Sequence, residues 1–191
     1  VLMQMVRLMR DGELVKVSKR TGKSITLVDL LDEVPIDAAR FFFNLREANS
    51  HFDFDLGLAI EQSSKNPVYY VQYAHARICS ILRNLEAEGI KMRALSLKDF
   101  DVLNAPEEIE LIRHLASLPM EIEDAAKSYD PARITKYSID LATMFHRFYT
   151  NCHVKGEEDN IQQARLSLCT AVKTALKNCS QILKIDCPES M

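Results

Sequence analysis

A short basic stretch, residues 16–23 (Lys-Val-Ser-Lys-Arg-Thr-Gly-Lys), carries the side chains best suited to chemistry in this chain. Its ammonium groups can neutralise anionic oxygens, and its hydroxyl and backbone N–H groups can donate directed hydrogen bonds. Gly22 allows the backbone to approach a bound anion closely. The same composition is also typical of a solvated surface loop, so these residues alone indicate either an anion site or a turn.

A second candidate site lies in a predicted helix over residues 132–150, where aromatic side chains alternate with polar and basic ones. Phe145 and Tyr149 are one helical turn apart, and several polar side chains are close in sequence: His146, Arg147, Asn151 and Lys155. Splayed RNA bases stack on such aromatic rings, with roughly 1–3 kcal/mol for each base, while cations bind the backbone. Packing in a protein core is the alternative for this aromatic stripe.

The predicted helix over residues 160–184 has one apolar face and a basic face that lies roughly opposite. Lys173, Lys177 and Lys184 form the basic face, and there is no Asp or Glu between residues 161 and 184. This face is either a track for phosphates or an ordinary solvated surface.

The chain has 191 residues, is 47% hydrophobic and carries a formal net charge of −3, which argues against a protein that coats nucleic acid with its whole surface. Its five cysteines, without a Cys-x-x-Cys pair, predict reduced thiols and a cytoplasmic protein. The spacing of Cys and His gives no metal site, and no apolar run reaches the ~20 residues of a membrane span. Because the chain begins without Met inside a predicted strand, we expect it to be part of a longer protein.

We predict two parts and a mainly α fold. Residues 1–62 begin with a β-hairpin that turns at Asp11-Gly12, followed by short helices, one of which is capped by Thr26 with Asp29. Pro35 suits the first turn of the next helix, and Asp55 is expected to cap another. Residues 63–191 are predicted to form an all-α bundle, with helices over about 68–89, 106–117, 120–129, 132–150 and 160–184.

Several motifs together resemble the arginyl-tRNA synthetases, a family of class I aminoacyl-tRNA synthetases. Residues 16–20 (Lys-Val-Ser-Lys-Arg) resemble the family's Lys-Met-Ser-Lys-Ser loop, and residues 37–40 (Asp-Ala-Ala-Arg) resemble its Asp-Ala-Leu-Arg motif. Residues 66–77 are similar to the helix that enters its anticodon-binding bundle. Residues 145–149 with Cys152, and the end of the chain at residues 187–191, also look like family features.

The resemblance implies that residues 1–62 are the end of a catalytic domain and that residues 63–191 are a helical anticodon-binding domain. It implies that Lys16, Ser18 and Lys19 contact ATP, supplied with Mg²⁺, and that Lys16 and Lys19 assist catalysis. It further implies that the anticodon stem-loop of tRNA(Arg) is bound by a set of residues from the bundle: Tyr73, Arg77, Phe145, Tyr149 and Met191. The fragment alone is expected to be inactive, monomeric and without affinity for DNA or membranes.

Two other classes of function stay open. The chain could be a stand-alone RNA-binding module without catalysis, or a helical module that binds protein through the surface around Phe41–Phe43. Neither class has a use for the loop at residues 16–23, whereas a piece of a synthetase does.

Overall fold

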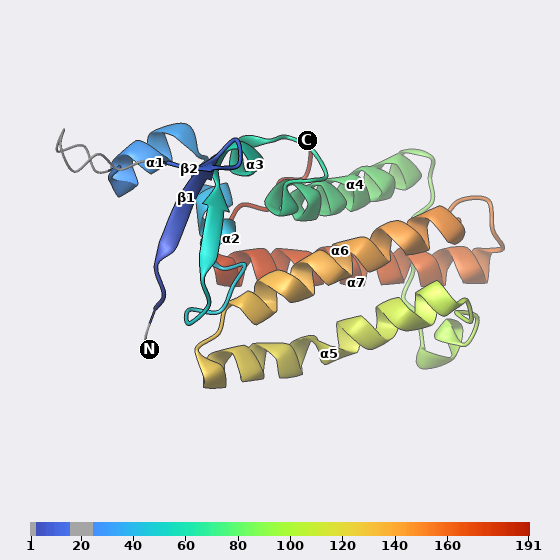
Figure 1. The fold of residues 1–191 in the computed structure, drawn as a ribbon. Helices are drawn as coiled ribbons and strands as arrows, with labels where there is room; N and C mark the ends of the chain where they lie inside the picture. Colours follow the sequence, from blue (N-terminus) through green and yellow to red (C-terminus); the bar gives the residue numbers. More distant parts are fainter. Residues whose placement is uncertain (1–2, 16–24) are drawn as a thin grey trace, which may run out of the picture.

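The computed structural model describes residues 3–15 and 25–191 and has a mainly α fold, as predicted. A small sheet and short helices lie at one end of four long helices, which run beside one another (Figure 1). The elements are, in chain order, β1 (Val6–Arg10), β2 (Glu13–Leu14), α1 (Leu27–Glu33), α2 (Ile36–Phe43), β3 (Phe52–Asp55), α3 (Leu56–Ile60), α4 (Pro67–Ala87), the 3₁₀ helix η1 (Leu97–Phe100), α5 (Pro106–Ser128), α6 (Ala132–Asn151) and α7 (Asp159–Leu183). None of the helices in the described ranges has the length and apolar character that crossing a membrane requires.

The predicted hairpin is present, and a third strand joins it. Asp11 and Gly12 both have positive φ, 54° and 79°, which a tight hairpin turn requires and which Gly adopts without strain. β3 pairs with β1 in parallel, so the strand order is β2-β1-β3. The Arg7 guanidinium donates to both carboxylate oxygens of Asp53 across this pair, at 2.6 and 2.9 Å.

The short helices begin where their capping residues predict. The Thr26 Oγ1 accepts from the Asp29 backbone N–H at 3.2 Å, and the Asp29 carboxylate accepts from the Thr26 N–H at 2.7 Å, which completes a capping box. Asp55 caps α3 by accepting from the Leu58 N–H at 3.0 Å. α2 begins directly after Pro35, as expected.

The prediction that Pro119 begins a new helix was wrong. Residues 106–128 form one helix, α5, with Pro119 inside it, instead of two helices at 106–117 and 120–129. A proline within a helix removes one backbone hydrogen bond and disfavours continuation, but packing can outweigh this local preference. α5 contacts α6 more extensively than any other two elements contact each other, which supplies that packing.

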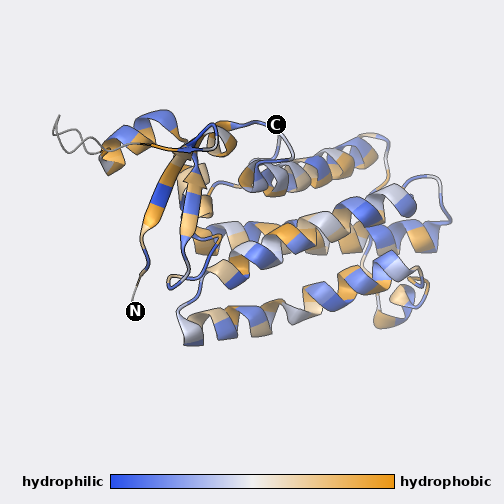
Figure 2. Cartoon of the chain, in the orientation of Figure 1, coloured by the Kyte–Doolittle hydropathy of each residue, from blue (hydrophilic) through white to orange (hydrophobic). Residues whose placement is uncertain are grey.

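One hydrophobic core connects the small sheet to the bundle. Figure 2 shows hydrophobic and hydrophilic residues alternating along the long helices, as amphipathic packing requires. The core cluster includes Phe42 and Phe54 near the sheet, Val71 on α4, and Leu176 on α7, all at most 2% exposed. The sheet end therefore packs directly on the helices that follow it.

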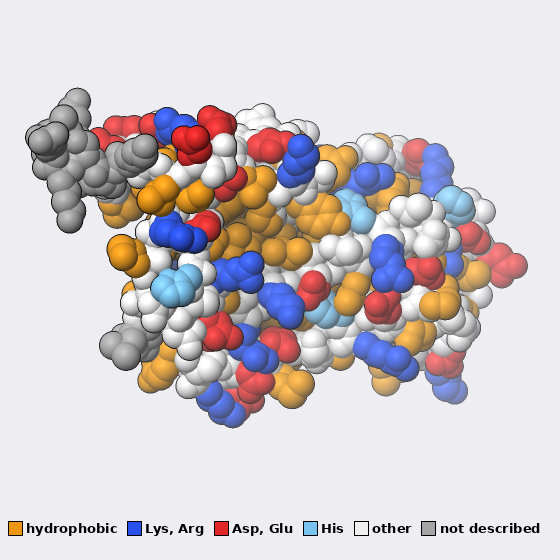
Figure 3. All heavy atoms as spheres, in the orientation of Figure 1, with side chains coloured by type: hydrophobic (Ala, Val, Ile, Leu, Met, Phe, Trp, Pro, Cys, Tyr) orange, Lys and Arg blue, Asp and Glu red, His pale blue; other side chains and the backbone are white. Residues whose placement is uncertain are grey.

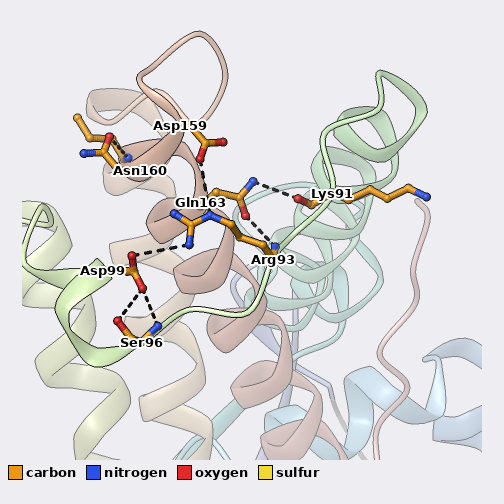
Figure 4. Close-up of polar contacts among 8 residues, drawn as sticks. Lys91, Arg93, Ser96, Asp99, Asp159, Asn160 and Gln163 are labelled. Carbon is orange, nitrogen blue, oxygen red and sulfur yellow. Dashed lines mark hydrogen bonds and ion pairs between the residues drawn. The ribbon is translucent and has the colours of Figure 1, made fainter.

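The long connection between α4 and α5 is held on the start of α7 by polar contacts (Figure 4). The buried Gln163 side chain donates to the Lys91 carbonyl at 3.0 Å and accepts from the Arg93 N–H at 2.9 Å. Arg93 also lies between the carboxylates of Asp99, at 3.7 Å, and Asp159, at 3.6 Å. These contacts fix a segment that has little helix or strand of its own.

Candidate nucleic-acid interface

A row of rings lies where α4 meets α6, and we call Tyr69, Tyr73 and His146 the aromatic row. Tyr69 and Tyr73 are one turn apart on α4 and stack with ring centroids 6.4 Å apart and planes within 7°. Tyr73 also stacks on His146 of α6, at 6.1 Å and 26°. Figure 3 shows exposed hydrophobic and histidine side chains over this junction, with Lys and Arg side chains nearby. Tyr73 is 39% exposed, so its ring can contact a ligand.

Arg77 extends the row by one further turn of α4. Its guanidinium carbon lies 4.9 Å from the centroid of the Tyr149 ring, a cation–π arrangement. Arg77 is exposed and has no carboxylate partner among the residues that the structure describes. Its charge is therefore available to an anionic ligand.

Phe145 does not fit its expected role as a residue that stacks on RNA. Its side chain is 0% exposed and lies in the core, where it packs against Tyr149 at 5.9 Å and Phe148 at 6.4 Å. A base cannot reach a ring that is covered on all sides, so Phe145 supports Tyr149 from beneath. The ring that lies outward at this turn of α6 is Tyr149.

His146 is held neutral within the aromatic row. Burial lowers its pKa below the ordinary value, and the positive charge of Arg77 lowers it further. Its Nε2 is buried and has no hydrogen-bond partner within the described part of the chain. His146 thus supplies an uncharged ring for Tyr73 to stack on, without adding a cation to the site.

Three polar side chains that the sequence places near the site are occupied by other contacts. Arg147 forms an ion pair with Glu110 at 3.2 Å, and Lys155 pairs with Glu88 at 2.6 Å. Asn151 donates to the Glu107 carboxylate at 2.8 Å. Arg77 is therefore a better candidate for contact with a polyanion than Arg147 or Lys155, because each of those two cations is paired with a carboxylate.

Two hollows flank the row. Arg77 and Tyr149 line a cavity of about 470 Å³ together with Asn84, Thr150 and His153. At the other end of the row, Tyr69 lines a cavity of about 360 Å³ that also contains Met191, 54% exposed. The row and these hollows bring Tyr73, Arg77, Tyr149 and Met191 to one region of the fold.

Sequence reasoning did not single out Tyr69 or the ring contact of His146. The spacing of Tyr69 and Tyr73, four residues apart on one helix, is a signal that could have identified the stack. The meeting of Tyr73 with His146 joins helices that are far apart in sequence, so no local pattern predicts it.

Three other kinds of site bear on the chemistry of this chain: an ATP site, a metal site and a reactive thiol. The predicted ATP contacts Lys16, Ser18 and Lys19 lie outside the described residues. No group of three or more His, Cys, Asp or Glu side chains within the described ranges is placed to hold a metal ion. Burial raises the pKa of Cys169 to about 12 and that of Cys179 to about 11, so these thiols are not activated nucleophiles.

Solved structures of arginyl-tRNA synthetases contain the same fold as this chain. An arginyl-tRNA synthetase crystal structure from Campylobacter jejuni superposes with a TM-score of 0.85 and 29% identity, over 100% of this chain and 40% of that one. The arginyl-tRNA synthetase of Thermus thermophilus gives a TM-score of 0.69 and 28% identity, over 81% of this chain and 26% of that one.

Comparison with protein sequences also finds similarity to arginine–tRNA ligases. An arginine–tRNA ligase of Caldanaerobacter subterraneus is 54% identical over all of this chain, and one of Acetivibrio thermocellus is 52% identical. The chain spans 34% of the length of each, and it matches their C-terminal part. The family model described as the DALR anticodon binding domain matches residues 71–191, the part that contains Tyr73, Arg77, His146 and Tyr149 but not Tyr69. The chain therefore belongs to the DALR anticodon-binding domain family.

Proposed function

We propose that this chain is the C-terminal part of an arginine–tRNA ligase and that it recognises the anticodon stem-loop of tRNA(Arg). The observation that carries the proposal is the aromatic row with Arg77 over Tyr149. All of these residues except Tyr69 lie within the segment that matches an anticodon-binding family. Stacked rings accept splayed bases of an RNA loop, and an unneutralised guanidinium attracts its phosphates. Neutral His146 completes a stacking surface in which Tyr73 is the exposed ring.

The base to be read follows from the genetic code. Every arginine codon has G in the middle, so the middle anticodon base is cytosine. We assign recognition of the loop to a set of four residues: Tyr73, Arg77, Tyr149 and Met191. Arg77 and Tyr149 line one hollow, Met191 lines the other, and Tyr73 stacks on Tyr69 of that second hollow. Phe145 is left out of this assignment because it is buried.

Residues 1–62 are assigned to the end of the catalytic domain. The ammonium groups of Lys16 and Lys19 and the hydroxyl of Ser18 are donors that suit phosphate oxygens of ATP bound with Mg²⁺. ATP supplies the adenylyl group of arginyl-adenylate and loses pyrophosphate, and these residues would bind and orient the ATP phosphates. The exposed side chains of Met3, Met5 and Val28, each at least 68% exposed, support contact with further catalytic-domain structure.

Substitutions on α4 test the assignment. The assay is fluorescence anisotropy of a labelled tRNA(Arg) anticodon stem-loop at about 0.1 M salt, where charges interact over about 10 Å. Tyr73→Ala should weaken binding roughly 5- to 150-fold, because it removes a stacking ring. Arg77→Gln should weaken binding and flatten its salt dependence, since a phosphate contact releases counterions.

The matched control is Arg113→Gln on α5, which removes the same charge from an exposed arginine outside the row. It should change the affinity less than about twofold, because Arg113 belongs neither to the aromatic row nor to the lining of the two hollows. Equal losses in the Arg77 and Arg113 variants would mean that only net charge attracts the RNA, and the assignment would be wrong.

We further expect that the 191-residue chain alone does not catalyse arginine-dependent ATP–pyrophosphate exchange. The family resemblance places the nucleotide-binding fold upstream of these residues. Measurable exchange by the purified chain, dependent on added arginine, would contradict this expectation.

A further inference from the structure

Asp37 joins three segments of the chain that are far apart in sequence. One oxygen of its carboxylate, Oδ2, accepts from the Gln72 side-chain amide at 3.1 Å and from the Asp186 backbone N–H at 3.1 Å. The Gln72 amide also donates to the Asp186 carbonyl at 3.0 Å. The three groups thus form a closed set of contacts between α2, α4 and the C-terminal segment that follows α7.

The rest of the C-terminal segment is held by α4 and by α7, whose Lys173 lies 3.7 Å from the Glu189 carboxylate. The His75 Nδ1 lies 2.8 Å from the Pro188 carbonyl, and both terminal nitrogens of Arg83 donate to the Glu189 carbonyl at 3.1 Å. Asp37 differs from these partners because it comes from α2, which precedes the segment matched by the anticodon-binding family. It therefore ties both the first turns and the last residues of that segment to the sheet end of the molecule.

This set of contacts lies beside the aromatic row. Asp37, Gln72, Tyr69 and Met191 all line the cavity of about 360 Å³. Tyr69 stacks directly on Tyr73, and Gln72 precedes Tyr73 in the chain. A shift of the C-terminal segment away from α4 would therefore move Met191 relative to the rings that the proposed function assigns to RNA.

We infer that Asp37 is a positioning residue that holds the C-terminal segment against α4 and thereby completes the anticodon site. This inference rests on the proposed function and gives a role to the first residue of the Asp-Ala-Ala-Arg motif at residues 37–40. Asp37 does not itself contact the RNA. It acts by fixing Asp186 and Gln72 in the geometry that places Met191 beside Tyr69.

The test compares Asp37→Ala with Asp37→Asn in the full 191-residue chain. Two stem-loops are used, one with the natural middle cytosine and one with adenine at that position. Asp37→Ala should lower the preference for cytosine about three- to tenfold, as expected when two hydrogen bonds are lost. Asp37→Asn keeps an oxygen acceptor at the same place and should stay within about twofold of the unaltered chain.

Hydrogen exchange of the Asp186 amide gives a second readout that does not depend on RNA. This amide should exchange at least about tenfold faster in Asp37→Ala, because its acceptor is gone, and at a near-normal rate in Asp37→Asn. The control is Asp32→Ala on α1, which removes an exposed carboxylate from the same end of the molecule and should change neither readout.

The outcomes separate the two proposals. An unaltered chain that binds both stem-loops equally would refute the proposed function, and the exchange of Asp186 would still test the role of Asp37. If the unaltered chain prefers cytosine and Asp37→Ala keeps both that preference and slow exchange at Asp186, the inference about Asp37 is wrong.

Discussion

Removing one partner of the buried ion pair between Arg165 and Glu108 should destabilise the protein strongly, because it leaves the other charge buried and unpaired. Glu108 is 1% exposed at the start of α5 and accepts from the Arg165 Nε on α7 at 2.6 Å and from the Ala105 N–H at 2.9 Å. Arg165, whose side chain is 13% exposed, also donates to the His153 carbonyl and lies 3.3 Å from Glu157. One guanidinium therefore connects two helices and the loop between α6 and α7.

Replacing Arg165 by Met removes the cation while keeping much of the side-chain volume. The Glu108 carboxylate then stays buried without its ionic partner, a situation that destabilises proteins by about 3–5 kcal/mol. In a chain of this size, each kcal/mol corresponds to about 2–4 °C in melting temperature, so the midpoint should fall by roughly 6–20 °C. Urea unfolding followed by far-UV circular dichroism measures the free energy directly.

The control is Arg147→Met, which breaks the ion pair with Glu110. Those two side chains are 57% and 42% exposed, so solvent screens their attraction and the loss should be about 0–1 kcal/mol. If Arg165→Met and Arg147→Met destabilise the protein equally, by less than about 1 kcal/mol, then burial does not govern these pairs and the reasoning is refuted.

Two further predictions concern the rings of the site. Because the folded pKa of His146 is lowered, the unfolded chain binds more protons near pH 6, so the free energy of unfolding should fall as the pH drops below about 6.5. His146→Gln should reduce this slope in urea titrations, and an unchanged slope would contradict the neutral His146. Phe145→Ala should destabilise the fold by about 3–5 kcal/mol, since it empties a fully buried site. Phe145→Leu is a milder change and should leave the preference for cytosine intact. A selective loss of that preference would show that Phe145 contacts the RNA after all.

Local sequence rules predicted the features that depend on neighbouring residues. The hairpin turn at Asp11-Gly12, the capping box of Thr26 with Asp29, and the cap at Asp55 each involve groups within three residues, and all are present. The long helices were predicted because apolar residues recur at helical spacing over many turns.

Features that depend on packing between distant segments could not be predicted in the same way. The parallel pairing of β3 with β1 joins Val6 to Phe52, and nothing in either strand specifies the partner. Pro119 is accommodated inside α5, whose contacts with α6 outweigh a local preference. Phe145 and Tyr149 share a helical stripe, and the packing of the neighbouring helices decides which ring stays exposed.

The most direct test of the central proposal is the binding of the unaltered chain to the two anticodon stem-loops that differ only in the middle base. A site that reads cytosine by hydrogen bonding and stacking should prefer it over adenine by about 1–3 kcal/mol, or roughly 5- to 150-fold. The preference should persist as salt rises, because base contacts carry little of the salt dependence. Equal binding to both stem-loops, lost together as the salt concentration rises, would show a basic helical surface and contradict the proposed anticodon recognition.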